Sequence, residues 1–179
     1  QSSAYLRPPA AIASSIGQGT NNYTTSQLAR YATTIASRGT SYSISLLDKV
    51  TDSQGNLVKD YTPEIINQMD VSDSEWDIIH NGMREVVENN AAFDDLDYAV
   101  SGKTGTAENT GHPSHGLFIG FTPSDDPEIA MAVRIANGYS STNAAAVAKD
   151  VIKYEYNLAD ESQLLSGTAT SGESTAQTD

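Results

Sequence analysis

One short segment carries residue types that could do chemistry together: residues 101–107, which read Ser-Gly-Lys-Thr-Gly-Thr-Ala. Side chains alternate along a strand, so Thr104 and Thr106 would share a face and could hold a carboxylate between their hydroxyls. Lys103 adds positive charge beside them, and Gly105 lets a ligand backbone lie close to the strand. An unpaired N–H at an exposed strand edge could donate to a developing oxyanion. The segment therefore suits acyl transfer on an extended peptide that ends in a carboxylate.

Other interpretations of these residues fit less well or stay open. Taken alone, the four-residue match also fits an ordinary strand that happens to contain Lys, Thr and Gly. A phosphate-binding loop needs a glycine five residues before Gly102, where Asp97 stands. His112 and His115 have a spacing that could bind a metal, but no third ligand is evident nearby. The sequence therefore predicts neither a metal site nor a cofactor.

Two helices are expected before this segment, because each opens with a capping box. Thr24 pairs with Gln27 in the first, and Ser72 pairs with Glu75 in the second. Apolar residues follow at helical spacing in both: Leu28, Tyr31, Ala32 and Ile35 in the first, and Trp76, Ile79, Met83, Val86 and Val87 in the second. Gly39 is a plausible stop for the first helix.

Strands and a last helix complete the predicted fold. Alternation predicts strands over 98–107, 115–121 and 129–136, followed by a helix over 142–156. The helix would pack through its apolar side chains, which are Ala146, Val147, Val151, Ile152 and Tyr154. Three antiparallel strands with a covering helix make an α+β fold.

The region between the two capped helices is expected to contain strands. A strand over 43–50, a turn and a return strand from Leu57 predict a small hairpin. Residues 63–69 would be short and helical or irregular. Residues 1–19 are expected to be irregular, since they contain two prolines and two glycines.

Composition limits the possible functions. The 179 residues suffice for one domain, and a net charge of −13 argues against binding nucleic acid. The chain has no cysteine, which excludes disulfides and thiolate metal sites. No apolar run approaches the ~20 residues of a membrane span. Residues 159–179 are rich in Ser, Thr, Gly and acid, so they predict a disordered tail after a folded unit of 1–158.

Several weak motifs in a fixed order give the chain a family resemblance. They are Ser-Ile-Gly-Gln-Gly at 15–19, Tyr-Thr at 23–24, Gly-Met at 82–83, Val-Val at 86–87, the lysine segment, and Gly-Phe-Thr-Pro at 120–123. Over about residues 10–158 this order resembles the class B penicillin-binding proteins. The segment at 15–19 resembles that of the elongation-type members.

The resemblance implies a fold and roles for residues. The fold would be the C-terminal half of the transpeptidase domain shared with serine β-lactamases. Lys103 would tune the charge of the acylation site, and the hydroxyls of Thr104 and Thr106 would bind the carboxylate of a peptidoglycan stem peptide or a β-lactam. Gly105 completes this substrate-binding set, and the N–H of Thr106 would be half of the oxyanion hole. The parent would be an extracytoplasmic D,D-transpeptidase, anchored to the membrane by a segment outside this chain.

The family's nucleophile is absent from the sequence. No lysine of the chain has a serine three residues before it, so there is no Ser-x-x-Lys. Ser-Thr-Asn at 141–143 follows the lysine segment, whereas the family places that motif before it; Ser141 or Thr142 is expected to cap the last helix instead. The chain is therefore expected to be inactive alone.

Two expectations about partners and function follow from the missing nucleophile. The chain should associate with the missing N-terminal half of the domain or form a homo-oligomer. A non-catalytic envelope binding module, and a relative of serine β-lactamases or β-lactam sensors, remain as alternative functions.

Overall fold

Helices and strands occupy most of the computed structural model, which describes residues 8–19, 21–109 and 111–164. The helices are α1 Pro8–Ser15, α2 Thr25–Ala36, α3 Asp73–Glu88, the 3-10 turn η2 Ala91–Phe93, α4 Ser141–Glu155 and α5 Glu161–Leu164. The strands are β1 Thr40–Tyr42, β2 Lys49–Thr51, β3 Leu57–Asp60, β4 Ile65–Gln68, β5 Ser101–Asn109, β6 His112–Thr122 and β7 Ile129–Ile135.

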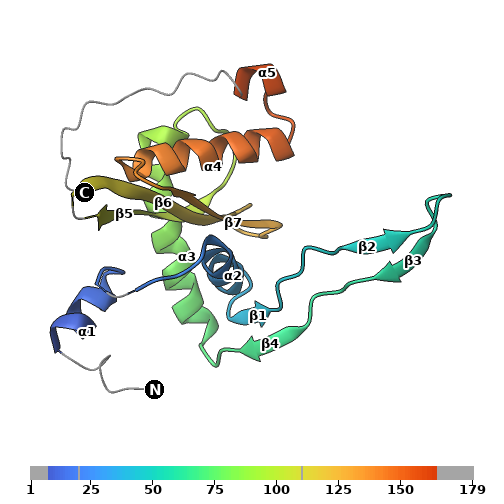
Figure 1. The fold of residues 1–179 in the computed structure, drawn as a ribbon, viewed down its shortest axis with the longest axis horizontal. Helices are drawn as coiled ribbons and strands as arrows, with labels where there is room; N and C mark the ends of the chain where they lie inside the picture. Colours follow the sequence, from blue (N-terminus) through green and yellow to red (C-terminus); the bar gives the residue numbers. More distant parts are fainter. Residues whose placement is uncertain (1–7, 20, 110, 165–179) are drawn as a thin grey trace.

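The body of the protein is a three-stranded antiparallel sheet with helices on both faces. The strand order is β5-β6-β7, so β6 is central. Helix α4 covers one face, and α2 lies on the other (Figure 1). Helix α3 supplies Val87 to the core on the α4 side and Trp76 and Met83 to the core on the α2 side. The predicted α+β fold with three antiparallel strands is confirmed.

The core on the α4 face is organised around Phe118 of β6, which is fully buried. Its ring packs on small residues of α4, which are Ala144, Ala145 and Ala148. A Cβ atom added at Gly120 would lie 2.7 Å from this ring, and one added at Gly102 would also collide with it. The two glycines therefore make room for the phenylalanine, and Gly102 is required by packing rather than by a ligand.

The core on the other face joins Phe121 of β6 to α2 and α3. Phe121 packs with Ile35, Trp76 and Met83. The buried His80 of α3 lies beside Phe121, with the ring centroids 4.8 Å apart, and its Nε2 is 2.8 Å from the carbonyl oxygen of Ile35. Both predicted capping boxes are present, at Ser72 for α3 and at Thr24 for α2.

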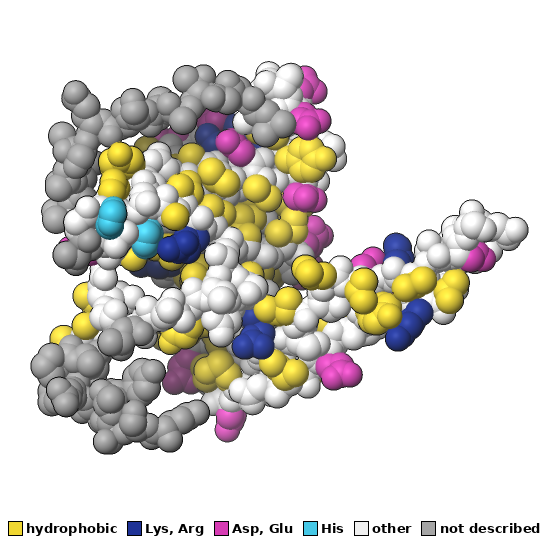
Figure 2. All heavy atoms as spheres, viewed as in Figure 1, with side chains coloured by type: hydrophobic (Ala, Val, Ile, Leu, Met, Phe, Trp, Pro, Cys, Tyr) yellow, Lys and Arg dark blue, Asp and Glu magenta, His cyan; other side chains and the backbone are white. Residues whose placement is uncertain are grey.

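An arm of paired strands, residues 40–68, extends away from the body (Figure 1). β1 pairs with β4 near the body, and β2 pairs with β3 further out. Every residue of β2, β3 and β4 is exposed, and Figure 2 shows apolar and basic side chains side by side along the arm. The outer pair is the predicted hairpin.

The arm also corrects two expectations. The predicted strand over 43–50 is correct only for Lys49 and Val50, which lie in β2; residues 43–48 lie between β1 and β2. The helical or irregular structure expected for residues 63–69 is wrong, because Ile65–Gln68 forms β4. Pairing with β1, more than twenty residues earlier in the chain, decides this conformation, and no local pattern in the sequence reports it.

Two helices differ from expectation. Residues Pro8–Ser15 form α1 instead of irregular structure, because prolines are compatible with a first helical turn, whose N–H groups have no partner in the helix. In α4 the buried face consists of Ala144, Ala145, Ala148 and Ile152, whereas the predicted contacts Val147, Val151 and Tyr154 are 43%, 41% and 57% exposed. The cap of α4 is Ser140, whose Oγ accepts a hydrogen bond from the Thr142 N–H at 3.2 Å, rather than Ser141 or Thr142.

The C-terminal tail is described only in part. Its first residues include the short helix α5, and residues 165–179 of the predicted disordered tail lie outside the described residues. Within the described ranges, no helix combines the length and the apolar character that crossing a membrane requires.

Candidate functional site

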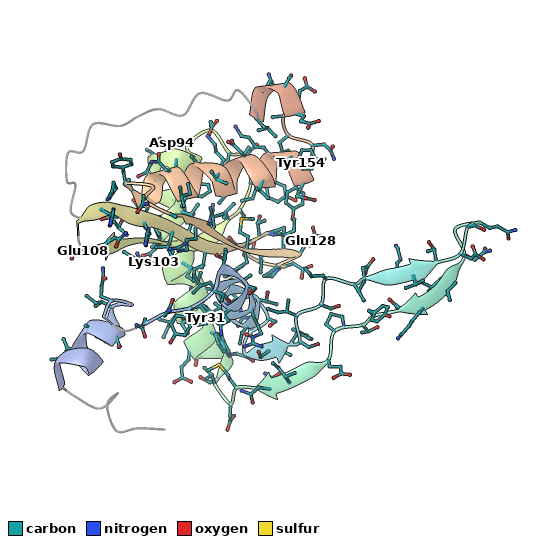
Figure 3. All side chains as sticks on the ribbon, in the orientation of Figure 1. Tyr31, Asp94, Lys103, Glu108, Glu128 and Tyr154 are labelled. Carbon is teal, nitrogen blue, oxygen red and sulfur yellow. The ribbon has the colours of Figure 1, made fainter. Side chains whose placement is uncertain are left out.

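The predicted site residues lie together on β5, which forms one edge of the sheet. In the part of the chain that the structure describes, β5 pairs only with β6, so its outer edge carries no further strand. Thr104 lies opposite Phe118 and Thr106 opposite Gly116, which puts both threonines on the α4 side of the strand. Lys103 lies opposite Ile119 and points to the other side. Figure 3 shows Lys103 and Glu108 at the end of the sheet away from the arm.

Two side chains reveal which backbone groups of β5 face outward. The Gln18 amide Nε2 donates to the Thr106 carbonyl at 3.3 Å, and Lys103 Nζ donates to the Thr104 carbonyl at 3.0 Å. The N–H and C=O of one residue in an antiparallel strand point to the same side. The N–H groups of Thr104 and Thr106 therefore face the free edge as well, where a bound molecule could receive their hydrogen bonds.

The site offers a lysine ammonium, two hydroxyls and outward N–H groups along a short stretch of strand. Lys103 and Thr106 are exposed, and Thr104 is half-buried. A Cβ atom at Gly105 would meet only Leu117 Cβ, at an ordinary 3.7 Å. Packing within the chain does not require this glycine, in contrast to Gly102, so Gly105 leaves free space beside the edge. The arrangement can hold an anionic, extended ligand and donate to an oxyanion.

The other candidate site residues from the sequence, the Ser-Thr-Asn segment and the two histidines, belong to a helix and a strand. Ser141 is buried at the first turn of α4, and Asn143 Nδ2 donates to the Gly138 carbonyl at 2.8 Å, so the Ser-Thr-Asn segment forms a helix start. His112 and His115 both lie on β6. The Nδ1 atom of His115 accepts a hydrogen bond from the Asn137 N–H at 3.0 Å. Within the described ranges, no three potential metal ligands come together.

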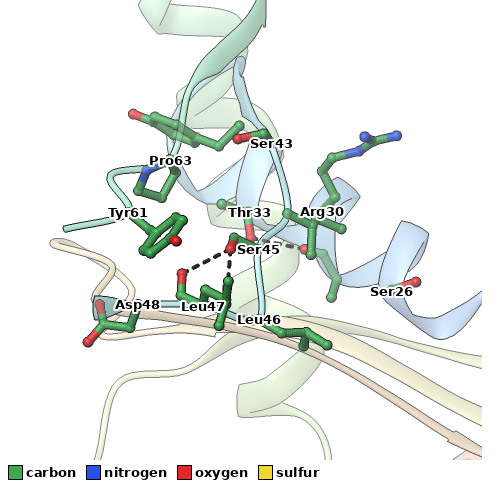
Figure 4. Close-up of a pocket in the computed structure, with 13 residues that line it drawn as sticks. Ser26, Arg30, Thr33, Ser43, Ser45, Leu46, Leu47, Asp48, Tyr61 and Pro63 are labelled. Carbon is green, nitrogen blue, oxygen red and sulfur yellow. Dashed lines mark hydrogen bonds between the residues drawn. The ribbon is translucent and has the colours of Figure 1, made fainter. Parts of the chain in front are cut away.

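The described part of the chain also has two hollows that sequence reasoning did not predict. A groove of about 520 Å³ lies between α2 and the base of the arm, and residues such as Arg30, Leu47 and Tyr61 line it (Figure 4). A polar pocket of about 430 Å³ lies between α3 and the start of β5, and it includes Arg84 and Ser101. Neither hollow is lined by Lys103, Thr104 or Thr106.

The largest pKa shifts belong to groups beside α4. Hydrogen bonds from Lys153 and Lys149 lower the pKa of Asp95 to about 2. Burial, followed by a hydrogen bond to the Glu128 carboxylate, raises the pKa of Tyr156 to about 12. These hydrogen bonds attach the loop after α3 to α4, and the residue before β7 to the C-terminal cap of α4.

Known proteins similar to this chain in sequence are penicillin-binding proteins. The family described as the penicillin binding protein transpeptidase domain matches residues 2–153. Penicillin-binding protein 2B of Streptococcus pneumoniae is 30% identical in an alignment 150 residues long that covers 74% of this chain and 22% of that protein. The peptidoglycan D,D-transpeptidase MrdA of Acinetobacter baumannii is 31% identical in an alignment 160 residues long that covers 80% of this chain and 24% of that protein. The chain thus spans less than a quarter of the length of either relative.

The solved structures that match this chain are also penicillin-binding proteins. Penicillin-binding protein 2 of Pseudomonas aeruginosa, solved in complex with WCK 5153, matches with a TM-score of 0.64 and 34% identity, over 82% of this chain and 32% of that chain. Penicillin-binding protein A of M. tuberculosis, solved as an imipenem acyl-enzyme complex, matches in fold with a TM-score of 0.76 and 24% identity, over 86% of this chain and 35% of that one. The chain belongs to the transpeptidase-domain family of penicillin-binding proteins, as its motifs predict.

Proposed function

We propose that this chain is the C-terminal part of a serine-type peptidoglycan D,D-transpeptidase that is acylated by β-lactams and acts in cell-wall synthesis. The chain supplies the strand with Lys103, Thr104 and Thr106, and the nucleophilic serine comes from polypeptide outside these 179 residues. The observation that carries the proposal is the hydrogen bond from Gln18 to the Thr106 carbonyl, because it implies that the Thr106 N–H faces the free edge.

The proposed reaction begins when the serine Oγ attacks the carbonyl carbon of the substrate's terminal peptide bond. The carbonyl oxygen becomes negatively charged, and the Thr106 N–H donates to it together with a second N–H from the serine's own residue. The C–N bond then breaks, the amine leaves with a proton, and an acyl-serine remains. The amine of a second stem peptide attacks this ester and releases the serine.

Substrate binding would use the side chains of the same strand. The hydroxyls of Thr104 and Thr106 lie on one face and donate to the substrate carboxylate. The side chain of Lys103 leaves the strand on the opposite face, and its ammonium reaches the outer edge, where it donates to the Thr104 carbonyl. From there its charge favours the anionic substrate and the charged transition state. In a chain with a net charge of −13, a local positive group at this edge is needed to offset the repulsion of an anion.

The exposed apolar stripe of α4 supports the expected association with the rest of the domain. Val147, Val151 and Tyr154 follow each other at helical spacing and are all at least 41% exposed. The outer edge of β7 likewise carries no strand in the described part of the chain. An N-terminal part of the domain would cover such surfaces; a homo-oligomer is the alternative, and light scattering separates the two from a monomer.

A fluorescent penicillin tests the proposal. The chain alone should remain unlabelled, and labelling should appear when a polypeptide with the family's Ser-x-x-Lys part is added, with the adduct located on that added part by mass spectrometry. Lys103→Met should lower the labelling rate of the complex by about 100-fold, the scale of a lost electrostatic group in an acylation site. The matched control is Lys59→Met, at an exposed lysine of the arm, which should label at the unchanged rate.

Two results would contradict the proposal. Labelling of the isolated chain would show that it carries its own nucleophile. Unlabelled complex, with both parts folded and associated, would instead favour a non-catalytic binding module of the cell envelope. Turnover of a chromogenic cephalosporin by the complex would indicate a β-lactamase. The expected location is extracytoplasmic, with the membrane anchor supplied by polypeptide outside this chain.

A further inference from the structure

The loop after α1 places the Gln18 side chain against the edge of β5. Gln18 Nε2 donates to the Thr106 carbonyl at 3.3 Å, although the two residues are 88 positions apart. Gln18 is half-buried, and the atom it contacts belongs to the residue whose N–H is the candidate oxyanion donor.

The backbone of Gln18 is held from both sides. Its N–H donates to the Ala13 carbonyl at 2.9 Å, and its carbonyl accepts from Asn21 Nδ2 at 3.2 Å. Gly17 and Gly19 flank it with φ values of +78° and +82°, a conformation that other residues adopt at a cost. These contacts fix the backbone position from which the Gln18 side chain reaches Thr106.

The backbone N–H and C=O of Thr106 are not held by the neighbouring strand β6. The N–H and C=O groups of its neighbours Gly105 and Ala107 point toward β6, and those of Thr106 point away. The register of the two strands shifts between Ala107 and Asn109, directly after this position. Thr106 thus lies next to the irregular end of the ladder, and the Gln18 amide holds its carbonyl on the side that β6 does not reach.

We propose that Gln18 is a positioning residue for the oxyanion hole. By holding the Thr106 carbonyl, its amide fixes the strand edge from which the Thr106 N–H donates. The inference rests on the proposed transpeptidase function and deepens it. Since the oxyanion exists only in the transition state and the intermediate, the contact acts on the acylation rate constant rather than on the affinity of the first, non-covalent complex.

Stopped-flow acylation of the two-part complex by a fluorescent penicillin separates these two quantities. Gln18→Met removes the donor at similar size, and it should lower the acylation rate constant by about 5- to 30-fold with less than a twofold change in initial affinity. Gln18→Lys returns a donor and should recover the rate to within about threefold of the native complex. Gln54→Met makes the same change at the exposed tip of the arm and serves as the control.

The outcomes separate a positioning role from a merely structural one. A native acylation rate for Gln18→Met would overturn the proposal. Equal losses for the Met and Lys variants, with a lowered melting temperature in both, would also overturn it, because they would mean that Gln18 only stabilises the fold.

A second measurement keeps the inference testable if the native complex is not acylated at all and the proposed function fails. Hydrogen exchange at the Gly105 and Ala107 amides, which face β6, should become about fivefold faster in Gln18→Met if the contact holds the strand. Unchanged exchange at both amides would refute the positioning role independently of any enzymatic activity.

Discussion

The sheet body and the arm are stabilised in different ways. In the body, Phe118 and Phe121 are fully buried between helices on either side of β6. In the arm, Val58 is 64% exposed, and the turn between β2 and β3 is held by Asp52, whose Oδ1 accepts from the backbone N–H groups of Gln54 and Asn56. Burial imposes the conformation of the body, whereas hydrogen bonds of the backbone and of one turn define the arm. The candidate site lies on the body.

The largest expected contrast between the two regions concerns apolar side chains. Phe118→Ala should lower the free energy of unfolding by about 3–5 kcal/mol, because it leaves a cavity between the sheet and α4. Val58→Ala on the arm should change it by less than about 0.5 kcal/mol, since an exposed side chain loses little contact. Urea unfolding followed by circular dichroism measures both. Comparable losses would mean that the arm is covered in solution.

Glycine substitutions also distinguish the body from the arm, because Gly→Ala should destabilise the two regions for different physical reasons. Gly102→Ala places a Cβ against the Phe118 ring and should cost about 1–3 kcal/mol through overpacking. Gly55→Ala in the arm meets no atom within 4 Å, but its φ of +86° is strained for alanine, at about 1 kcal/mol. Asparagine tolerates this φ, so thermal unfolding should find Gly55→Asn milder than Gly55→Ala. At Gly102 asparagine should be worse than alanine; the same order at both sites would refute the distinction.

The smallest expected effect is electrostatic and depends on pH. Hydrogen bonds from Lys153 and Lys149 lower the Asp95 pKa from 3.8 to about 2, so the folded state favours the ionised form. The resulting stability is present at neutral pH and is lost as the pH falls from about 4 to about 2. Because these groups are partly exposed, Asp95→Asn should lower the melting temperature at pH 7 by only about 1–3 °C.

Calorimetry at pH 7 and pH 2 checks this sign, since the difference between Asp95→Asn and the native protein should disappear at the lower pH. Asp52→Asn is the matched change in the arm, where hydrogen bonds from Asn56 also lower the aspartate pKa. It should leave the melting temperature of the body unchanged at both values. A constant deficit of Asp95→Asn across the pH range would indicate a role other than ion pairing.

The parts of the fold that the sequence predicts well are those encoded by neighbouring residues. Both capping boxes hold as predicted, because a cap depends on residues three positions apart. The three strands of the body are predicted because their alternation and their turns are local. The lysine segment is found for the same reason, since all its residues lie on one strand.

What the sequence leaves hidden depends on contacts between distant residues. Pairing with β1 makes a strand of β4, and the sequence around Ile65 does not signal it. Asp95 binds two lysines of α4, more than fifty residues away, and the residues around it do not signal this contact. Gln18 belongs to the motif at 15–19 that contributes to the family resemblance. Its contact with Thr106 spans 88 residues, so the motif does not indicate which residue Gln18 touches.

The position of α3 between the two cores has a consequence for how the protein loses its structure. Val87 at one end of the helix belongs to the core under α4, and Trp76 at the other end belongs to the core under α2. Neither core can come apart without disturbing this shared helix, so the two halves of the body should melt in a single cooperative transition. Trp76 is the only tryptophan of the chain and is 3% exposed. Its fluorescence is therefore an intrinsic reporter for the melting of the entire body, including the strand that carries Lys103.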